Sequence, residues 1–193
     1  LTGPPQTVVL YGDPTKPVIA NGQTYFAIQT RRAELADNET FRRLSEDQKR
    51  VFLRNEVREH NKLLVETAQH AGVETPADFA VFQDHGYRGL YGGLGAKDIH
   101  GRKGLKKSEA ILDHMGSTEL AANLFRATQA EEKLRRDEVV GKDAANHTHH
   151  EVGKQVRKAI EEIGGTMPED LPTPDRSVKA LEREQKRLEG GDE

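Results

Sequence analysis

The feature that most constrains the fold of this chain is the spacing of largely apolar residues in two long segments. One seam runs from Leu53 to Ala71 and the other from Ala145 to Ile163, and both repeat with the spacing 4, 3, 4, 3, 4. Since an α-helix completes a turn in about 3.6 residues, this spacing gathers each set of side chains on one helical face. The chain is therefore predicted to contain long amphipathic helices that pack against one another.

Capping signals set the expected starts and ends of the helices. Ser45 and Gln48 match a capping box that begins a long helix, and Thr75 begins a shorter helix expected to end near Gly86. Further helices are expected over residues 17–37, 107–116, 117–138, 143–163 and 175–188. No hairpin or alternating strand pattern follows residue 13, and aromatic residues make up only 5% of the chain. We predict an all-α fold, an elongated multi-helix domain.

The composition excludes several classes of protein and of site. None of the 193 residues is cysteine, which rules out disulfides, cysteine nucleophiles and cysteine-based zinc sites. No apolar run approaches the roughly 18 residues of a membrane span, and no signal sequence is recognisable. We expect a soluble cytoplasmic protein without a membrane partner.

One internal segment departs from the helical pattern. Residues 86–107, GYRGLYGGLGAKDIHGRKGLKK, hold seven glycines, two tyrosines and six cationic side chains against one acid. Glycines permit close backbone approach, cations neutralise phosphates and tyrosines stack on bases, so the segment is predicted to be a mobile interaction loop for a polyanion. The alternative is a loop whose tyrosines fill the core and whose lysines face only water. The candidate contact residues are Arg88, Lys97, Arg102, Lys103, Lys106, Lys107, Tyr87 and Tyr91.

Some of the histidines are spaced like metal ligands, but the sequence does not contain a complete metal-binding motif. His147, His150 and Glu151 share one helical face, but the zincin motif is absent and no third-ligand motif lies nearby. His149 falls on the apolar seam and is expected to be a hydrogen-bonded core histidine. We therefore predict no metal and no cofactor.

Carboxylates for a nuclease are scattered along the chain. The candidates are Asp84, Asp98, Asp113 and the EEK triplet at residues 131–133, in which the adjacent Glu132 and Lys133 point to different helical faces. A metal-dependent nuclease would require distant acids to converge in the fold. No catalytic residue is assigned, and the chain is predicted not to be an enzyme.

Long stretches of the chain resemble the bacterial DNA-damage-inducible protein D family. They include YGGLGAKDIHGRKGLKKSEAILDHMGSTELAANLFRATQAEEKLRRD and GKDAANHTHHEVGKQVRKAIEEIGGTMPEDLPTP, and the resemblance covers about residues 11–185. It implies a non-enzymatic, nucleoid-associated protein of the SOS response that modulates homologous recombination by acting on RecA filaments on single-stranded DNA. A direct DNA-binding regulator of phage antirepressor type is the alternative.

The resemblance also suggests three parts of the chain. Family members usually begin with a domain like the phage antirepressor or BRO amino-terminal domain, and residues 1–40 are expected to hold only its closing helix. Residues 41–164 are the predicted helical core. Residues 165–193 are expected to be a linker and an acidic amphipathic helix, with ten acids and five bases over residues 161–193. This separable tail would dock on the body or on a second subunit, the latter making a homo-oligomer.

Overall fold

A computed structural model describes residues 43–189, and every regular element in this range is a helix. The α-helices are α3 (Glu46–His70), α4 (Pro76–Leu90), α5 (Ala96–Arg102), α6 (Ser117–Arg136), α7 (Lys142–Glu162) and α8 (Val178–Glu189). Two short 3₁₀-helices are η1 (Ile111–His114) and η2 (Pro168–Asp170). Because residues 43–189 contain no strand, they confirm the prediction of an all-α fold. The helix expected over residues 17–37 lies outside the described residues.

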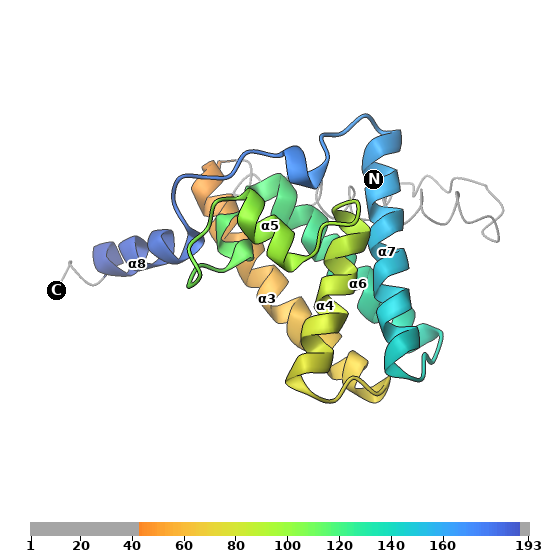
Figure 1. The fold of residues 1–193 in the computed structure, drawn as a ribbon. Helices are drawn as coiled ribbons and strands as arrows, with labels where there is room; N and C mark the ends of the chain where they lie inside the picture. The colour runs from red at the N-terminus through yellow and green to blue at the C-terminus, as the bar shows by residue number, and fades with distance from the viewer. Residues whose placement is uncertain (1–42, 190–193) are drawn as a thin grey trace, which may run out of the picture.

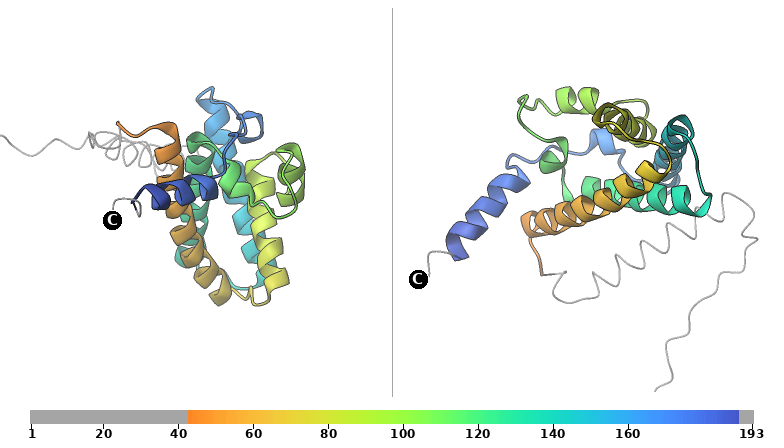
Figure 2. Two further views of the ribbon diagram at one scale, coloured as in Figure 1. Left: turned by 90° about the vertical axis from the view of Figure 1, so that its left-hand side faces the viewer. Right: turned by 90° about the horizontal axis from the view of Figure 1, so that it is seen from below.

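Four long helices form a body of two layers. α3 packs along α6 in one layer and α4 packs along α7 in the other, while contact between α6 and α7 joins the layers (Figures 1 and 2). Apolar side chains such as Leu64, Phe82 and Leu120 are fully buried where the helices meet. None of the helices between residues 43 and 189 is long and apolar enough to cross a membrane.

The predicted capping box at the start of α3 is confirmed. The Gln48 amide donates to Ser45 Oγ at 3.3 Å, and the Ser45 amide donates to Gln48 Oε1 at 2.9 Å. Thr75 caps α4 in the same way, with Asp78 as its partner. These side chains satisfy amides that have no acceptor within their own helix.

The expected end of the Thr75 helix near Gly86 is wrong, because α4 continues to Leu90. Gly86 and Gly89 lie on the face of α4 that packs against α7, and Gly153 of α7 lies opposite them. A Cβ on Gly89 would stand 2.2 Å from the His150 carbonyl oxygen and 3.0 Å from Gly153 Cα. These glycines therefore permit the close approach of two helices and do not break one.

The helix expected over residues 107–116 is also wrong, since only the 3₁₀-helix η1 forms there. The fully buried Arg50 explains the difference. Its Nε donates to the Met115 carbonyl at 3.0 Å and its Nη2 donates to the Asp113 carbonyl at 3.3 Å. In an α-helix these carbonyls would accept hydrogen bonds from backbone amides of the next turn, but here they accept hydrogen bonds from Arg50.

The segment expected to be a free linker lies against the body. We call residues 165–177 the strap; it runs from the end of α7 across the body to α8 (Figure 1). Pro168 is buried, and Glu169 forms a two-pronged ion pair with Arg157 at 2.7 and 2.8 Å. Val178 and Leu181 then dock the first turns of α8, which contacts α3. The strap and the start of α8 therefore contact the body of the same chain.

Candidate functional site

The glycine-rich segment 86–107 is folded, which corrects the expectation of a mobile loop. It comprises the end of α4, a turn, the helix α5 and a second turn. Gly92 and Gly93 in the first turn have φ values of 62° and 99°, which favour glycine. Asp98 accepts a hydrogen bond from the Gly95 amide at 2.9 Å and so begins α5. The cations of the segment are thus displayed on fixed elements.

Three of the predicted contact residues are exposed lysines whose charge is not paired within residues 43–189. Lys97 lies in the first turn of α5, and Lys106 and Lys107 follow the turn after it. Within residues 43–189 none of these three ammonium groups forms an ion pair. They are available to an anionic partner without breaking any internal ion pair.

Arg88 and Arg102 are about half exposed but already have partners. Arg88 pairs with Asp84 at 2.6 Å and donates to the Gly93 carbonyl at 3.1 Å, which ties the turn to α4. Arg102 donates to the Glu169 carbonyl at 2.9 Å and to Asp170 at 3.0 Å, so it holds the strap. An incoming phosphate would compete with these contacts.

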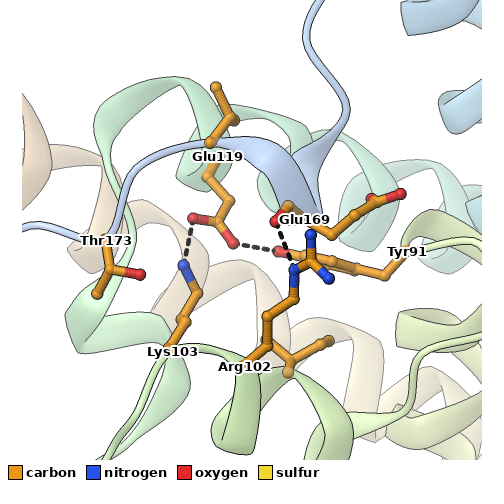
Figure 3. Close-up of a pocket in the computed structure, with 8 residues that line it drawn as sticks. Tyr91, Arg102, Lys103, Glu119, Glu169 and Thr173 are labelled. Atoms are coloured by element: carbon orange, nitrogen blue, oxygen red, sulfur yellow. Dashed lines mark hydrogen bonds and ion pairs between the residues drawn. The ribbon is translucent and has the colours of Figure 1, made fainter.

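Lys103 is placed differently from its neighbours. Its side chain is only 7% exposed, and its ammonium donates to Glu119 Oε2 at 2.8 Å, with Glu119 itself fully buried (Figure 3). A lysine in this position is an internal counter-ion and has no free charge for a phosphate. The expectation that Lys103 contacts a polyanion directly is therefore not supported by its position.

The two tyrosines belong to the core. Tyr87 is 8% exposed and its ring lies 5.0 Å from the Arg126 guanidinium, while Tyr91 is 1% exposed. A ring in this environment has no face to offer a base, so the stacking role is corrected to the core-filling alternative. The Tyr91 hydroxyl donates to Glu119 Oε1 at 2.8 Å.

A cavity of about 130 Å³ lies beside this cluster, between α5, α6 and the strap (Figure 3). Tyr91, Lys103 and Glu119 line its inner side, and Arg102, Glu169 and Thr173 line its mouth. Burial raises the pKa of Glu119 and its two donors oppose this rise, while burial beside Glu119 raises the pKa of the Tyr91 hydroxyl well above its usual range. Since both oxygens of Glu119 already accept hydrogen bonds, this carboxylate is built to hold structure.

The polar cluster continues through the core to α7. The Asn123 amide donates to the Tyr91 hydroxyl at 2.9 Å, and the Arg126 guanidinium donates to Asn123 Oδ1 at 3.4 Å and to His149 Nε2. His149 Nδ1 then donates to the Phe82 carbonyl at 2.9 Å. Because a guanidinium only donates and a carbonyl only accepts, the imidazole must be neutral.

His149 thus confirms the prediction of a hydrogen-bonded core histidine. It is fully buried, and its burial together with the Arg126 charge holds its pKa well below the ordinary value of 6.5. A positive charge on the nearby His85 also disfavours a charge on His149. The pKa of His85 is itself lowered by burial and by His150. Protonation of this ring would require the network to break.

This geometry predicts acid sensitivity. Below pH 6.5 the unfolded chain binds a proton at His149 that the folded chain does not bind. The free energy of unfolding must therefore fall as the pH falls, by up to about 1.4 kcal/mol per pH unit. Urea denaturation between pH 7.5 and 5 measures the slope. His149→Gln should flatten it, whereas His147→Gln, at an exposed position of the same helix, should keep it. Equal slopes in the two variants would contradict the assignment.

The remaining candidates do not gather into a site. Asp84 pairs with Arg88, Asp98 caps α5, and Asp113 pairs with Arg54 at 2.8 Å. Within residues 43–189 no three histidine, aspartate or glutamate side chains are grouped so that they could hold a metal ion. The scattered acids of the sequence are therefore used in separate structural contacts.

Comparison with known proteins gives the family. Residues 44–181 match the family described as the DinD C-terminal domain. The chain belongs to this family. DNA damage-inducible protein D of Escherichia coli (strain K12) is 71% identical over 175 residues, which are 91% of this chain and 64% of that protein. The chain thus spans less than two thirds of the length of that relative. No solved structure gives a significant match.

The family match confirms the resemblance seen in the sequence, and it extends over the strap and the first turn of α8. Sequence reasoning missed the importance of two features. It treated the strap as a linker, and it counted Lys103 among the free cations. The strap carries a weak signal in Glu169 and Asp170, which lie between Pro168 and Pro172 at the point where the strap meets Arg157 and Arg102.

Proposed function

We propose that the protein acts in the response to DNA damage by binding recombinase filaments on single-stranded DNA and so modulating homologous recombination. The observation that carries the proposal is membership of the DinD C-terminal domain family, together with the name of a 71% identical relative, DNA damage-inducible protein D. The names of the family and of the relative mention no enzymatic activity. A binding role without catalysis agrees with them.

The surface supports a contact with phosphates at one place in particular. Lys97, Lys106 and Lys107 are exposed on and beside α5, and their ammonium groups form no ion pair within residues 43–189. Long-range attraction to a polyanion needs such uncompensated charge, because paired cations present little net field. Arg88 and Arg102 belong to the same segment and would strengthen the contact once released from Asp84 and Asp170.

The fixed backbone of this segment suits a filament. A recombinase filament presents phosphates and protein in a regular array, and a rigid display of cations binds such an array with little loss of conformational entropy. Neither the buried tyrosines nor Lys103 takes part in this contact. We assign the binding charge to the three free lysines.

The proposal is tested by titrating the protein with a fluorescent oligothymidylate, first bare and then coated with a recombinase. We expect tighter binding to the filament at matched salt. In Lys97→Gln/Lys106→Gln/Lys107→Gln the slope of log K against log salt on bare DNA should be smaller by about 2, because each phosphate that a lysine neutralises on a single strand contributes about 0.7 to that slope.

A matched control removes the same charge from cations that are already paired. Lys62, Lys133 and Lys154 pair with Glu59, Asp137 and Glu151 on the surface. Their replacement by glutamine should leave binding close to that of the parent, since surface pairs contribute little to stability and none of these lysines lies in the segment 86–107. Equal binding of parent, control and test variants to the filament would refute the proposed contact, and no response to the filament would refute the proposed function.

A further inference from the structure

Several acids of the acidic tail are paired with arginines. In the strap and α8, four carboxylates are each held by an arginine: Glu169 by Arg157, Asp170 by Arg102, Glu182 by Arg58 and Glu184 by Arg176. Three of these four arginines belong to the body, so the charges of Glu169, Asp170 and Glu182 are balanced by it. These pairs leave the cations of α8 without a share in neutralising them.

The cations of α8 share one face. Lys179, Arg183, Lys186 and Arg187 are spaced by 4, 3 and 1 residues, and all four are exposed. Within residues 43–189 none of the four pairs with a carboxylate. We call this set the α8 stripe. At about 100° per residue it lies roughly opposite Val178 and Leu181, the side chains that dock the helix.

The strap fixes the stripe in place. Arg50, buried in the body, donates to the Arg176 carbonyl at 2.7 Å just before α8 begins, and Glu169 anchors the strap to Arg157. α8 begins beside η1, the element into which the turn carrying Lys106 and Lys107 leads (Figures 1 and 2). Beyond its docked turns the helix projects from the body, which leaves its cationic face open.

We propose that the α8 stripe binds the sugar-phosphate backbone of single-stranded nucleic acid. The inference rests on the proposed function and adds a second contact surface, on the part of the chain whose overall charge is negative. A stripe of lysine and arginine along one helical face, with no acid in it, is the charge pattern of phosphate contact. The sugar-phosphate backbone matches this stripe because it carries regularly spaced negative charges.

Two other partners fit the stripe less well. An anionic membrane would require a free apolar face on the same helix, but Val178 and Leu181 are buried against the body and only Leu188, 65% exposed, remains. A protein interface is normally centred on aromatic or apolar anchors and is poor in lysine. The stripe contains no such anchor.

The test uses the full chain and bare fluorescent oligothymidylate at several salt concentrations. Lys179→Gln/Arg183→Gln/Lys186→Gln/Arg187→Gln removes the stripe, and glutamine keeps the helix propensity close to that of lysine and arginine. If each residue touches one phosphate, the slope of log K against log salt should decrease by about 3. Circular dichroism and the melting temperature verify that α8 and the body remain folded.

Two controls isolate the position of the charge from its amount. Replacing Lys62, Lys133, Arg135 and Lys154 by glutamine removes the same charge from paired surface cations and should leave the slope unchanged. Lys179→Arg/Lys186→Arg preserves the charge and should bind like the parent. Polyglutamate at equal charge concentration serves as an acidic polypeptide probe and should bind weakly and without dependence on the stripe.

The outcomes separate this inference from the proposed function. An unchanged slope in the stripe variant overturns the inference even if the filament still responds through Lys97, Lys106 and Lys107. Stripe-dependent binding of polyglutamate as strong as that of DNA also overturns it. Conversely, a stripe-dependent slope on bare DNA supports the inference even if the recombinase filament gives no response, which would count only against the proposed function.

Discussion

Gly89→Ala is expected to destabilise the protein by about 2–3 kcal/mol, although alanine is the better helix former. The added Cβ would stand 2.2 Å from the His150 carbonyl oxygen and 3.0 Å from Gly153 Cα, and both are backbone atoms of α7. A flexible side chain could turn away, but a helix backbone must move as a whole. Such overpacking costs about 1–3 kcal/mol and here separates the two helices of one layer. Urea denaturation followed by circular dichroism measures the loss.

Gly101→Ala is the matched control within the same glycine-rich segment. Gly101 lies in α5, and a Cβ built on it meets nothing within 4 Å. Alanine should therefore stabilise the protein by about 0.5–1 kcal/mol through the smaller entropy of the unfolded chain. If Gly89→Ala were as well tolerated as Gly101→Ala, the close packing of α4 on α7 would be wrong.

The same glycines show how far the sequence predicts the fold. The 4, 3 spacing from Leu53 to Ala71 and from Ala145 to Ile163 correctly predicts α3 and α7, because it depends only on the geometry of one helix. Gly86 and Gly89 locally indicate a loop, since glycine is unfavourable inside an isolated helix. Gly89 is required by the α7 backbone at His150 and Gly153, and Gly86 by the side chains of Arg126 and His149. These partners lie at least forty residues away, so no local rule can predict them.

The candidate site was predictable to a similar extent. The concentration of cations in residues 86–107 is visible in the sequence, but their availability depends on distant acids. Arg102 pairs with Asp170 of the strap and Lys103 pairs with Glu119 of α6, while the ammonium groups of Lys106 and Lys107 form no ion pair within residues 43–189. The tail shows the opposite effect, because arginines of the body pair with three of its acids, Glu169, Asp170 and Glu182. The net charge of a segment therefore predicts a charged surface only when the ion pairs that its side chains form with the rest of the fold are known.

Lys103→Met is expected to cost about 3–5 kcal/mol of stability at pH 7. The variant leaves the fully buried Glu119 carboxylate without its counter-ion, and breaking a buried pair from one side leaves an uncompensated charge in the core. The Tyr91 hydroxyl still donates to Glu119, but one neutral donor offsets only part of the loss. Urea denaturation of parent and variant at pH 7 measures the difference. A loss below about 1 kcal/mol would show that Lys103 behaves as a surface lysine.

The pH dependence of this loss identifies its cause. Burial already raises the pKa of Glu119 above its ordinary value of 4.5, and without the Lys103 charge the folded-state pKa must rise further. A carboxyl whose pKa is raised on folding contributes full stability below pH 4.5 and loses it as the pH rises through the folded-state value. The penalty of Lys103→Met should therefore shrink as the pH falls from 7 towards 5. The double variant Lys103→Met/Glu119→Gln should be more stable than Lys103→Met at pH 7, and its difference from the parent should lack this trend. A penalty equal at pH 5 and pH 7 would mean that lost packing of the lysine stem, and not the stranded carboxylate, causes the destabilisation.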